Sequence, residues 1–159
     1  MNDAARTLGD AKGGIAIELF SFVVGGQDYC VDIMSVREIR SGARATPLPH
    51  APAYLLGVIN LRGTVLPIVD LSTRLGLATG ANSTRNVVIV VAIGARTIGL
   101  MVDAVSDILA IQEHDLQLPP DLPADNERSF VSALTIVDDR MIRVLDLTSI
   151  LPSAGEETA

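Results

Sequence analysis

Short runs of apolar and β-branched residues recur along the chain, and Gly, Pro or Asp separates most of them from the next. Runs of this length, rich in Val, Ile and Leu, are typical of β-strands. The strands predicted in this way are 17–24, 29–34, 58–61, 64–69, 87–93, 98–102, 130–137 and 141–145. Gly25-Gly26, Arg62-Gly63 and Gly94-Ala95 stand between paired runs, where a tight hairpin turn is expected. The pattern predicts an all-β chain built from hairpins, with few and short helices.

The same pattern of apolar positions occurs twice. With an offset of 69 residues (94 − 25), segment 22–39 lies over segment 91–108. With an offset of 76 residues (146 − 70), segment 61–75 lies over segment 137–151. Because the two units occur in the same order twice, the sequence predicts a structural repeat.

The repeat predicts two similar lobes within a single folded domain at 15–151. One lobe is expected at about 15–77 and the other at about 86–151, each with about five short strands closed into a small barrel. The stretch Leu77–Arg85, LATGANSTR, is the expected linker between them. Residues 1–14 and 152–159 are polar or small and aperiodic, so both ends are expected to be flexible.

Composition excludes several classes of protein. Of 159 residues, 48% are hydrophobic and 3% aromatic, and the net charge is −7. This content excludes wholesale disorder, while the acidic charge and scarce aromatic residues disfavour nucleic-acid binding, including that of an oligonucleotide-binding barrel. The N-terminus lacks the pattern of a secretory signal, and the longest uncharged apolar run, Val87–Ala95, is too short to span a bilayer. We therefore expect a cytoplasmic protein without membrane insertion, in which the single cysteine, Cys30, packs in the core.

Residues for catalysis are scarce. The sequence has no GxSxG elbow, Walker loop, GxGxxG fingerprint, HExxH or CxxC motif, and its two histidines are 64 residues apart. Asp138-Asp139 is typical of a hairpin turn, and Asp70 and Asp146, each followed by Ser and Thr residues, are expected to cap short helices. An enzyme or a carrier of small ligands would need convergent polar groups in a pocket. We expect no catalytic residue, metal or cofactor.

The most informative polar residue is an arginine inside an apolar run, GVINLRGTVLPIVDL, at residues 57–71. A buried and unpaired guanidinium would cost several kcal/mol, so Arg62 must face solvent or have a partner. Asn60 and Gly63 flank it in the predicted turn, and Gly63 is expected to have a positive φ. Glu38 also lies among apolar neighbours. Two interpretations stay open: a solvated turn arginine beside an unrelated surface glutamate, or an ion pair that fixes one face for a partner.

These motifs resemble the CheW family of chemotaxis coupling proteins, which share their fold with the regulatory domain of CheA-type histidine kinases. The resemblance runs from about Glu18 to Pro152 and is most specific in GVINLRGTVLPIVDL. Two patterns support it, the spacing of Gly25, Tyr29, Val31, Ile33, Val36, Glu38 and Ile39, and VDAVSDIL at 102–109. Ala133 departs from the family, which often has glycine before the last strands.

The resemblance implies two five-stranded SH3-like or OB-like barrels around a shared core, and a scaffold without enzyme activity or cofactor. Such a scaffold couples the cytoplasmic tips of chemoreceptors to a CheA-type kinase. The implied receptor-binding residues are Val36, Glu38, Arg62, Val87, Val88 and Gly99. The kinase regulatory domain is expected mainly on the second lobe, and rings with that domain or between copies are possible assemblies. An adaptor of a non-motility chemosensory pathway is the alternative.

Overall fold

A computed structural model of the chain describes residues 15–77, 87–118 and 130–152. The predicted flexible ends and the predicted linker lie outside these residues, apart from Leu77 and Pro152. Within the described ranges ten of the fourteen regular elements are strands and the other four are helices of three or four residues, which confirms the all-β prediction.

Ten strands form in the described ranges, including all eight that the apolar runs predict. The strands are β1 (Ala16–Val24), β2 (Gln27–Asp32), β3 (Val36–Ser41), β4 (Leu55–Leu61), β5 (Thr64–Asp70), β6 (Val87–Ile93), β7 (Arg96–Val102), β8 (Ala104–Gln112), β9 (Val131–Val137) and β10 (Arg140–Leu145). The helices are single turns, namely η1 (Ile33–Ser35), α2 (Leu71–Arg74), η2 (Glu113–Asp115) and α3 (Leu147–Ile150). Strands β3 and β8 are the two that the sequence did not predict.

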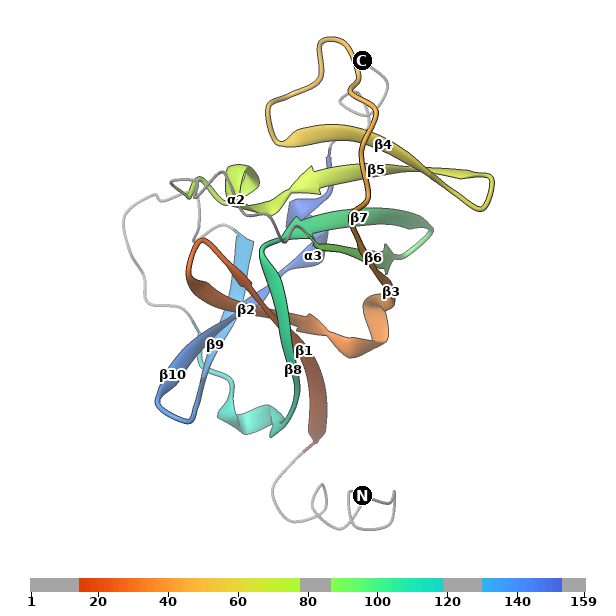
Figure 1. The fold of residues 1–159 in the computed structure, drawn as a ribbon. Helices are drawn as coiled ribbons and strands as arrows, with labels where there is room; N and C mark the ends of the chain where they lie inside the picture. Colours follow the sequence, from red (N-terminus) through yellow and green to blue (C-terminus); the bar gives the residue numbers. More distant parts are fainter. Residues whose placement is uncertain (1–14, 78–86, 119–129, 153–159) are drawn as a thin grey trace.

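The strands form two five-stranded sheets, one in the order β3-β6-β7-β5-β4 and the other in the order β8-β1-β2-β10-β9 (Figure 1). A pair of backbone hydrogen bonds closes each sheet beyond its edge strands. Thr46, after β3, exchanges hydrogen bonds of 2.8 and 2.9 Å with Val58 of β4. Gln117, after β8, exchanges hydrogen bonds of 2.8 and 2.7 Å with Leu134 of β9. We call the first unit the Arg62 barrel and the second the Asp138 barrel, after a residue in one hairpin turn of each.

The barrels do not coincide with the predicted lobes 15–77 and 86–151, and this part of the prediction is wrong. The hairpin β1–β2 belongs to the Asp138 barrel, where β1 pairs with β8 and β2 runs parallel to β10. The hairpin β6–β7 belongs to the Arg62 barrel, where β6 pairs with β3 and β7 runs parallel to β5. Each half of the chain therefore contributes one hairpin to the barrel of the other half.

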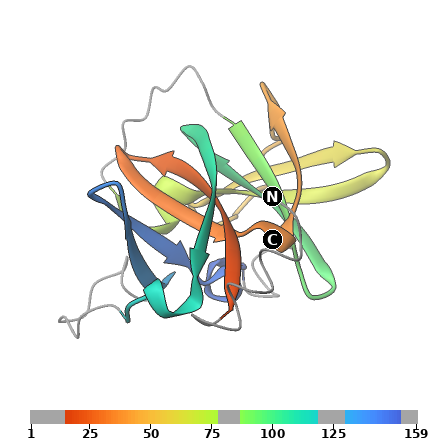
Figure 2. The ribbon, with the colours of Figure 1, turned by 90° about the horizontal axis from the view of Figure 1, so that it is seen from below.

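The repeat itself is confirmed at the level of register. Ile39 pairs with Ile89 in one barrel, and the equivalent residues Ile108 and Phe20 pair in the other. A β-bulge interrupts both ladders at the same place, and the parallel pair Ile68–Gly99 has its counterpart in Val144–Cys30. Figure 2 shows the β4–β5 and β9–β10 hairpins on opposite sides of the molecule.

The main hydrophobic core lies between the barrels and takes side chains from both sheets. Among its fully buried members, Phe22 and Tyr29 come from the β1–β2 hairpin, and Ile98 and Leu100 come from β7. The exchange of hairpins thus places strands of both halves around one core. Cys30 is buried as predicted, and burial raises the pKa of its thiol to about 12.

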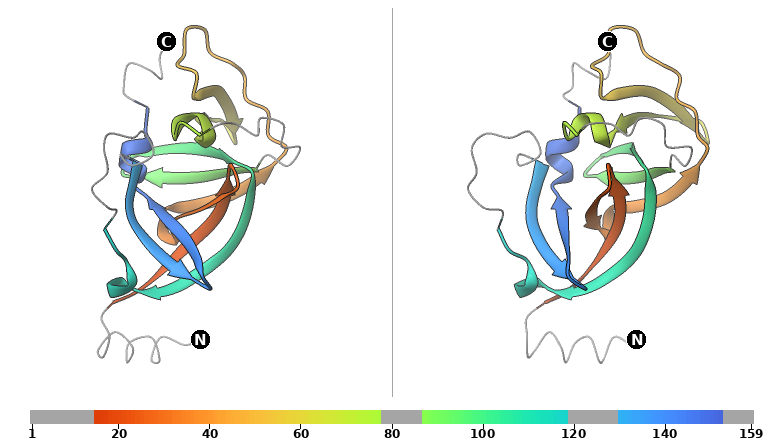
Figure 3. Two further views of the ribbon diagram at one scale, coloured as in Figure 1. Left: turned by 90° about the vertical axis from the view of Figure 1, so that its left-hand side faces the viewer. Right: turned by 60° about the vertical axis from the view of Figure 1, so that its left-hand side comes forward.

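Helices α2 and α3 lie beside each other where the barrels meet, and Arg74 of α2 links them (Figure 3). Its guanidinium donates to the carbonyl oxygens of Ser149, Ile150 and Leu151 at 3.3, 3.2 and 3.2 Å. It also lies 4.0 Å from the ring centroid of Tyr54. The arginine therefore satisfies three carbonyl groups at the end of a helix that has few other partners for them.

Candidate functional site

The turn between β4 and β5 projects Arg62 from the end of its barrel. Arg62 and Gly63 have φ values of +51° and +85°, so both turn residues adopt the left-handed conformation of a tight hairpin. The backbone N–H of Gly63 donates to Oδ1 of Asn60 at 2.8 Å. The predicted positive φ of Gly63 is confirmed, and Asn60 holds the turn by its side chain.

Arg62 is both exposed and paired, which answers the question that its apolar surroundings raise. Its Nη2 lies 2.5 Å from Oε1 of Glu38, a residue of the edge strand β3. Nη1 of Arg40, two residues along the same strand, lies 3.1 Å from Oε2 of Glu38. Of the two interpretations left open by the sequence, the structure therefore contains the ion pair, and a second arginine that the sequence reasoning missed completes it. Because β3 places residues i and i+2 on the same face, the spacing of Glu38 and Arg40 was the available signal.

The ion pair leaves the carboxylate accessible but fixed. The side chain of Glu38 is 26% exposed and that of Arg62 is 70% exposed. The hydrogen bond from Arg62, followed by that from Arg40, lowers the pKa of Glu38 below its usual value. The same pair raises the pKa of Arg62, so both groups stay charged at neutral pH.

An open groove of about 410 Å³ lies beside this pair at the mouth of the Arg62 barrel. Its apolar lining comes from Leu61, Leu66 and Val90, and its charged rim comes from Arg37, Glu38 and Arg62. Apolar surface inside and fixed charges at the rim are the usual composition of a protein–protein contact. Among the described residues, no group of His, Cys, Asp or Glu side chains is placed to hold a metal ion. The arrangement is suited to binding a protein surface.

The other implied receptor-binding residues lie deeper. Val36 and Val87 are half-buried and pack against the main core. Val88 is 1% exposed and Gly99 is buried, and their assignment to the receptor-binding face stays a prediction. Both point into the Arg62 barrel, where a Cβ on Gly99 would lie 2.8 Å from Cγ1 of Val88 and 2.5 Å from Cδ1 of Ile68. Their role is to set the close packing beneath the outer face.

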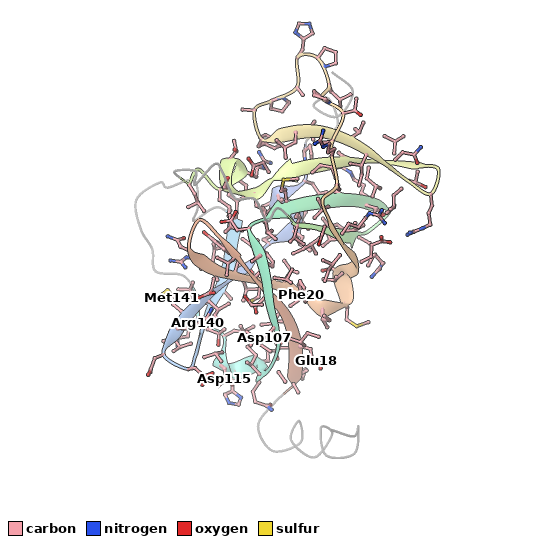
Figure 4. All side chains as sticks on the ribbon, in the orientation of Figure 1. Glu18, Phe20, Asp107, Asp115, Arg140 and Met141 are labelled. Atoms are coloured by element: carbon pink, nitrogen blue, oxygen red, sulfur yellow. The ribbon has the colours of Figure 1, made fainter. Side chains whose placement is uncertain are left out.

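The Asp138 barrel presents a different surface at the equivalent hairpin. Ile136 and Met141 are directly opposed across β9 and β10 and are 60% and 48% exposed. Arg140, beside them, makes a bidentate pair with Asp28 of β2, with Nε 3.0 Å from Oδ2. Figure 4 labels Arg140 and Met141 on this hairpin and Asp107 on β8. The pair ties the hairpin to the rest of the barrel and leaves the apolar residues accessible.

A two-barrel β-protein with a charged groove on one barrel and an exposed apolar pair on the other belongs to the class of interaction modules. The chain is a member of the CheW-like domain family, whose model matches residues 18–155. It is 51% identical over 159 residues to the chemotaxis protein CheW of Rhizobium meliloti, with all of both chains covered. It is 31% identical over 136 residues to the chemotaxis protein CheW of Klebsiella aerogenes, which covers 86% of this chain and 82% of that one.

The fold has a close counterpart among solved structures. The scaffolding protein TtCheW from Thermoanaerobacter tengcongensis superposes with a TM-score of 0.81 at 30% identity, over 90% of this chain and 97% of that one. No helix in the described part of the chain is long and apolar enough to cross a membrane.

Proposed function

We propose that this protein is a non-enzymatic scaffold of chemotaxis signalling in the cytoplasm, which couples chemoreceptor tips to a CheA-type histidine kinase. The observation that carries the proposal is the Glu38–Arg62 pair at the rim of an apolar groove, in a chain of the CheW-like family. A scaffold needs fixed recognition groups on a rigid frame, and the closed barrels provide that frame.

The receptor binds at the mouth of the Arg62 barrel in this proposal. Arg62 and Glu38 give the contact its register, and Val36 and Val87 support the surface from below. The ion pair exists before the partner arrives, so little side-chain entropy remains to be lost on binding.

The kinase regulatory domain binds the Asp138 barrel. Ile136 and Met141 form an exposed apolar pair on a hairpin that Arg140 and Asp28 hold in place. Exposed apolar side chains of this kind supply the binding free energy of protein–protein contacts when a partner buries them. The two partners therefore meet different barrels and do not compete.

Calorimetric titration with a receptor cytoplasmic fragment tests the first contact. Arg62→Ala should weaken binding about fivefold, the effect of losing one solvent-exposed charge contact. Arg140→Ala is the matched control, because it removes an ion pair of the same type from the other barrel and should leave receptor affinity unchanged. Equal receptor affinity of wild type and Arg62→Ala would overturn the assignment of this face.

Titration with the kinase regulatory domain tests the second contact. Ile136→Ser should weaken that binding about tenfold or more, because the side chain lies at the centre of the proposed contact. Val65→Ser is the control, since Val65 is 62% exposed on the equivalent hairpin of the Arg62 barrel and should have no effect. A loss of kinase affinity with Val65→Ser and none with Ile136→Ser would place the kinase on the Arg62 barrel and overturn this assignment.

A further inference from the structure

The mouths of the two barrels have the same backbone plan and share several apolar positions. The order of strands, the register and the position of the bulge are equivalent, so the mouth beside β3 and β4–β5 has a counterpart beside β8 and β9–β10. The equivalent apolar pairs are Val36 and Val105, Ile39 and Ile108, and Leu66 and Ile142. The backbone that frames the first mouth, and several of its apolar positions, therefore have counterparts at the second.

The net charges at the two mouths have opposite signs. Glu38 and its equivalent Asp107 are both acidic, but Asp138 stands where the first barrel has Arg62. Around Glu38 lie Arg37, Arg40 and Arg62. The corresponding mouth contains three carboxylates and one arginine, namely Asp28, Asp107, Asp138 and Arg140.

Arg140 cannot replace Arg62 as a contact for an acidic partner. Both of its donor nitrogens on one edge bind the carboxylate of Asp28. The hydrogen bond with Asp28 raises the pKa of Arg140, and the nearby charges of Asp107 and Asp138 raise it further. The guanidinium is thus surrounded by carboxylates, and the mouth as a whole stays negative.

We infer that the opposite charges of Arg62 and Asp138, at equivalent turns, determine which barrel binds an acidic receptor surface. Asp138 and Asp107 exclude that surface from the second barrel. The inference rests on the proposed function and specifies its partner, because the receptor surface over Arg62 must then carry carboxylates. Like charges across a contact are an effective means of rejecting a partner that shape alone would admit. Because the charge is reversed between the two mouths, a scaffold with two similar barrels binds its two partners in one orientation only.

The test is to place an arginine at the second mouth. Arginine fits this turn, because Asp138 has a φ of +53° and Arg62 has a φ of +51° in the equivalent turn. With a receptor fragment added in excess, wild type should bind one copy, with NMR shift changes confined to β3 and the β4–β5 turn. Asp138→Arg should bind a second copy, and new shift changes should appear on β8 near Val105 and Ile108.

Two further variants make the result decisive. Asp138→Asn removes the negative charge without adding a positive one, and it should raise affinity at the second mouth less than Asp138→Arg does. Arg62→Asp combined with Asp138→Arg should move binding from the first barrel to the second. If wild type binds the fragment but Asp138→Arg binds only one copy, at β3 and the β4–β5 turn, and the double variant shows no shift changes on β8, this inference alone would be overturned. Absence of binding by wild type would overturn the proposed function together with it.

Discussion

The two barrels share a backbone plan but differ in what fills and surrounds it. Inside the Arg62 barrel, Ile59 and Val90 belong to an apolar cluster. The equivalent positions of the Asp138 barrel hold Thr135 and Ser21, which are 1% and 4% exposed. The hydroxyl of Ser21 donates to the carbonyl of Asp107 at 2.9 Å and accepts from its N–H at 3.0 Å, which fixes the bulge in β8. Both barrels keep the alternation of apolar residues along the strands and the turns, so the fold depends on these. Residues inside a barrel can be polar instead of apolar if hydrogen bonds compensate for the burial.

The junction between the barrels departs from the repeat in another way. Tyr54 and Phe130 are equivalent residues, each accepting a backbone hydrogen bond from the aspartate that starts the next helix, at 2.7 and 2.8 Å. Arg74 lies between their rings, 4.0 and 5.1 Å from the centroids, whereas its own equivalent is the buried Ile150. The site between the two rings therefore holds Arg74 of α2, and the equivalent residue of α3 is packed in the core instead.

The largest expected difference between the barrels concerns Gly57 and its equivalent, Ala133. Gly57 has a φ of +144°, and a Cβ there would lie 2.1 Å from the carbonyl oxygen of Thr46. Gly57→Ala should therefore lower the free energy of unfolding by roughly 3 kcal/mol or more, through backbone strain and overpacking. Ala133→Gly should cost only about 1 kcal/mol. Urea denaturation followed by circular dichroism measures both, and equal effects would show that the two strands have the same backbone constraint.

The apolar pattern predicted every strand with at least one strongly buried face. It missed β3, VREIRS, and β8, AVSDILAIQ, which are mostly exposed and carry the bulges, so their alternation of apolar and polar residues is broken. The exchange of hairpins also lay beyond sequence reasoning. A repeated sequence specifies two equal sets of pairing surfaces, and it does not indicate which copy of a hairpin joins which sheet.

The site was predicted in part for a similar reason. The ion pair of Arg62 and Glu38 was one of the two interpretations that the cost of an unpaired arginine left open, and the structure contains it. The sequence did not indicate that Val88 and Gly99 are buried, because a strand buried on both faces has no polar alternation that tells the two faces apart. Which apolar residue faces a partner is settled by the packing of the barrel.

A second difference concerns the first residue of each short helix. Leu71 is 0% exposed in the main core, while its equivalent, Leu147, is only half-buried. Leu71→Ala should cost about 2–5 kcal/mol of unfolding free energy, and Leu147→Ala about half of that. Thermal and urea unfolding of both variants provide the comparison. A larger loss with Leu147→Ala would mean that the second barrel contributes more to the shared core than its burial indicates.

Substitutions in the hairpin turns are expected to change the free energy of unfolding by smaller amounts, with opposite signs in the two barrels. Gly63 has a φ of +85° with no neighbouring atom near the position of a Cβ, so Gly63→Val should cost about 1–2 kcal/mol from backbone strain alone. Asp139 holds the same place in the other turn with a φ of +64°, and Asp139→Gly should stabilise the protein by about 0.5 kcal/mol. Unfolding curves in urea separate the two signs. Stabilisation by Gly63→Val would contradict the conformational argument.

The smallest expected effect is the pH dependence that the ion pair gives to the Arg62 barrel. Hydrogen bonds from Arg62 and Arg40 hold the pKa of Glu38 below its usual value of 4.5 in the folded state. The pair therefore stabilises the fold above about pH 4.5, and this contribution is lost as the pH falls through the lowered folded pKa of Glu38. Glu38→Gln should make stability depend less on pH in that acidic window, and salt should reduce the difference because the pair is exposed.

Arg62→Ala should remove most of the same pH dependence, and combining it with Glu38→Gln should add little, since both variants break one interaction. Arg140→Ala, in the other barrel, should leave the effect of Glu38→Gln unchanged, because residues in separate barrels with no shared partner act independently. Urea unfolding at a series of pH values gives the four curves. If Glu38→Gln retained the acid profile of wild type, the ion pair would exist without contributing to stability. Its role would then be confined to presenting a fixed carboxylate and guanidinium to the receptor.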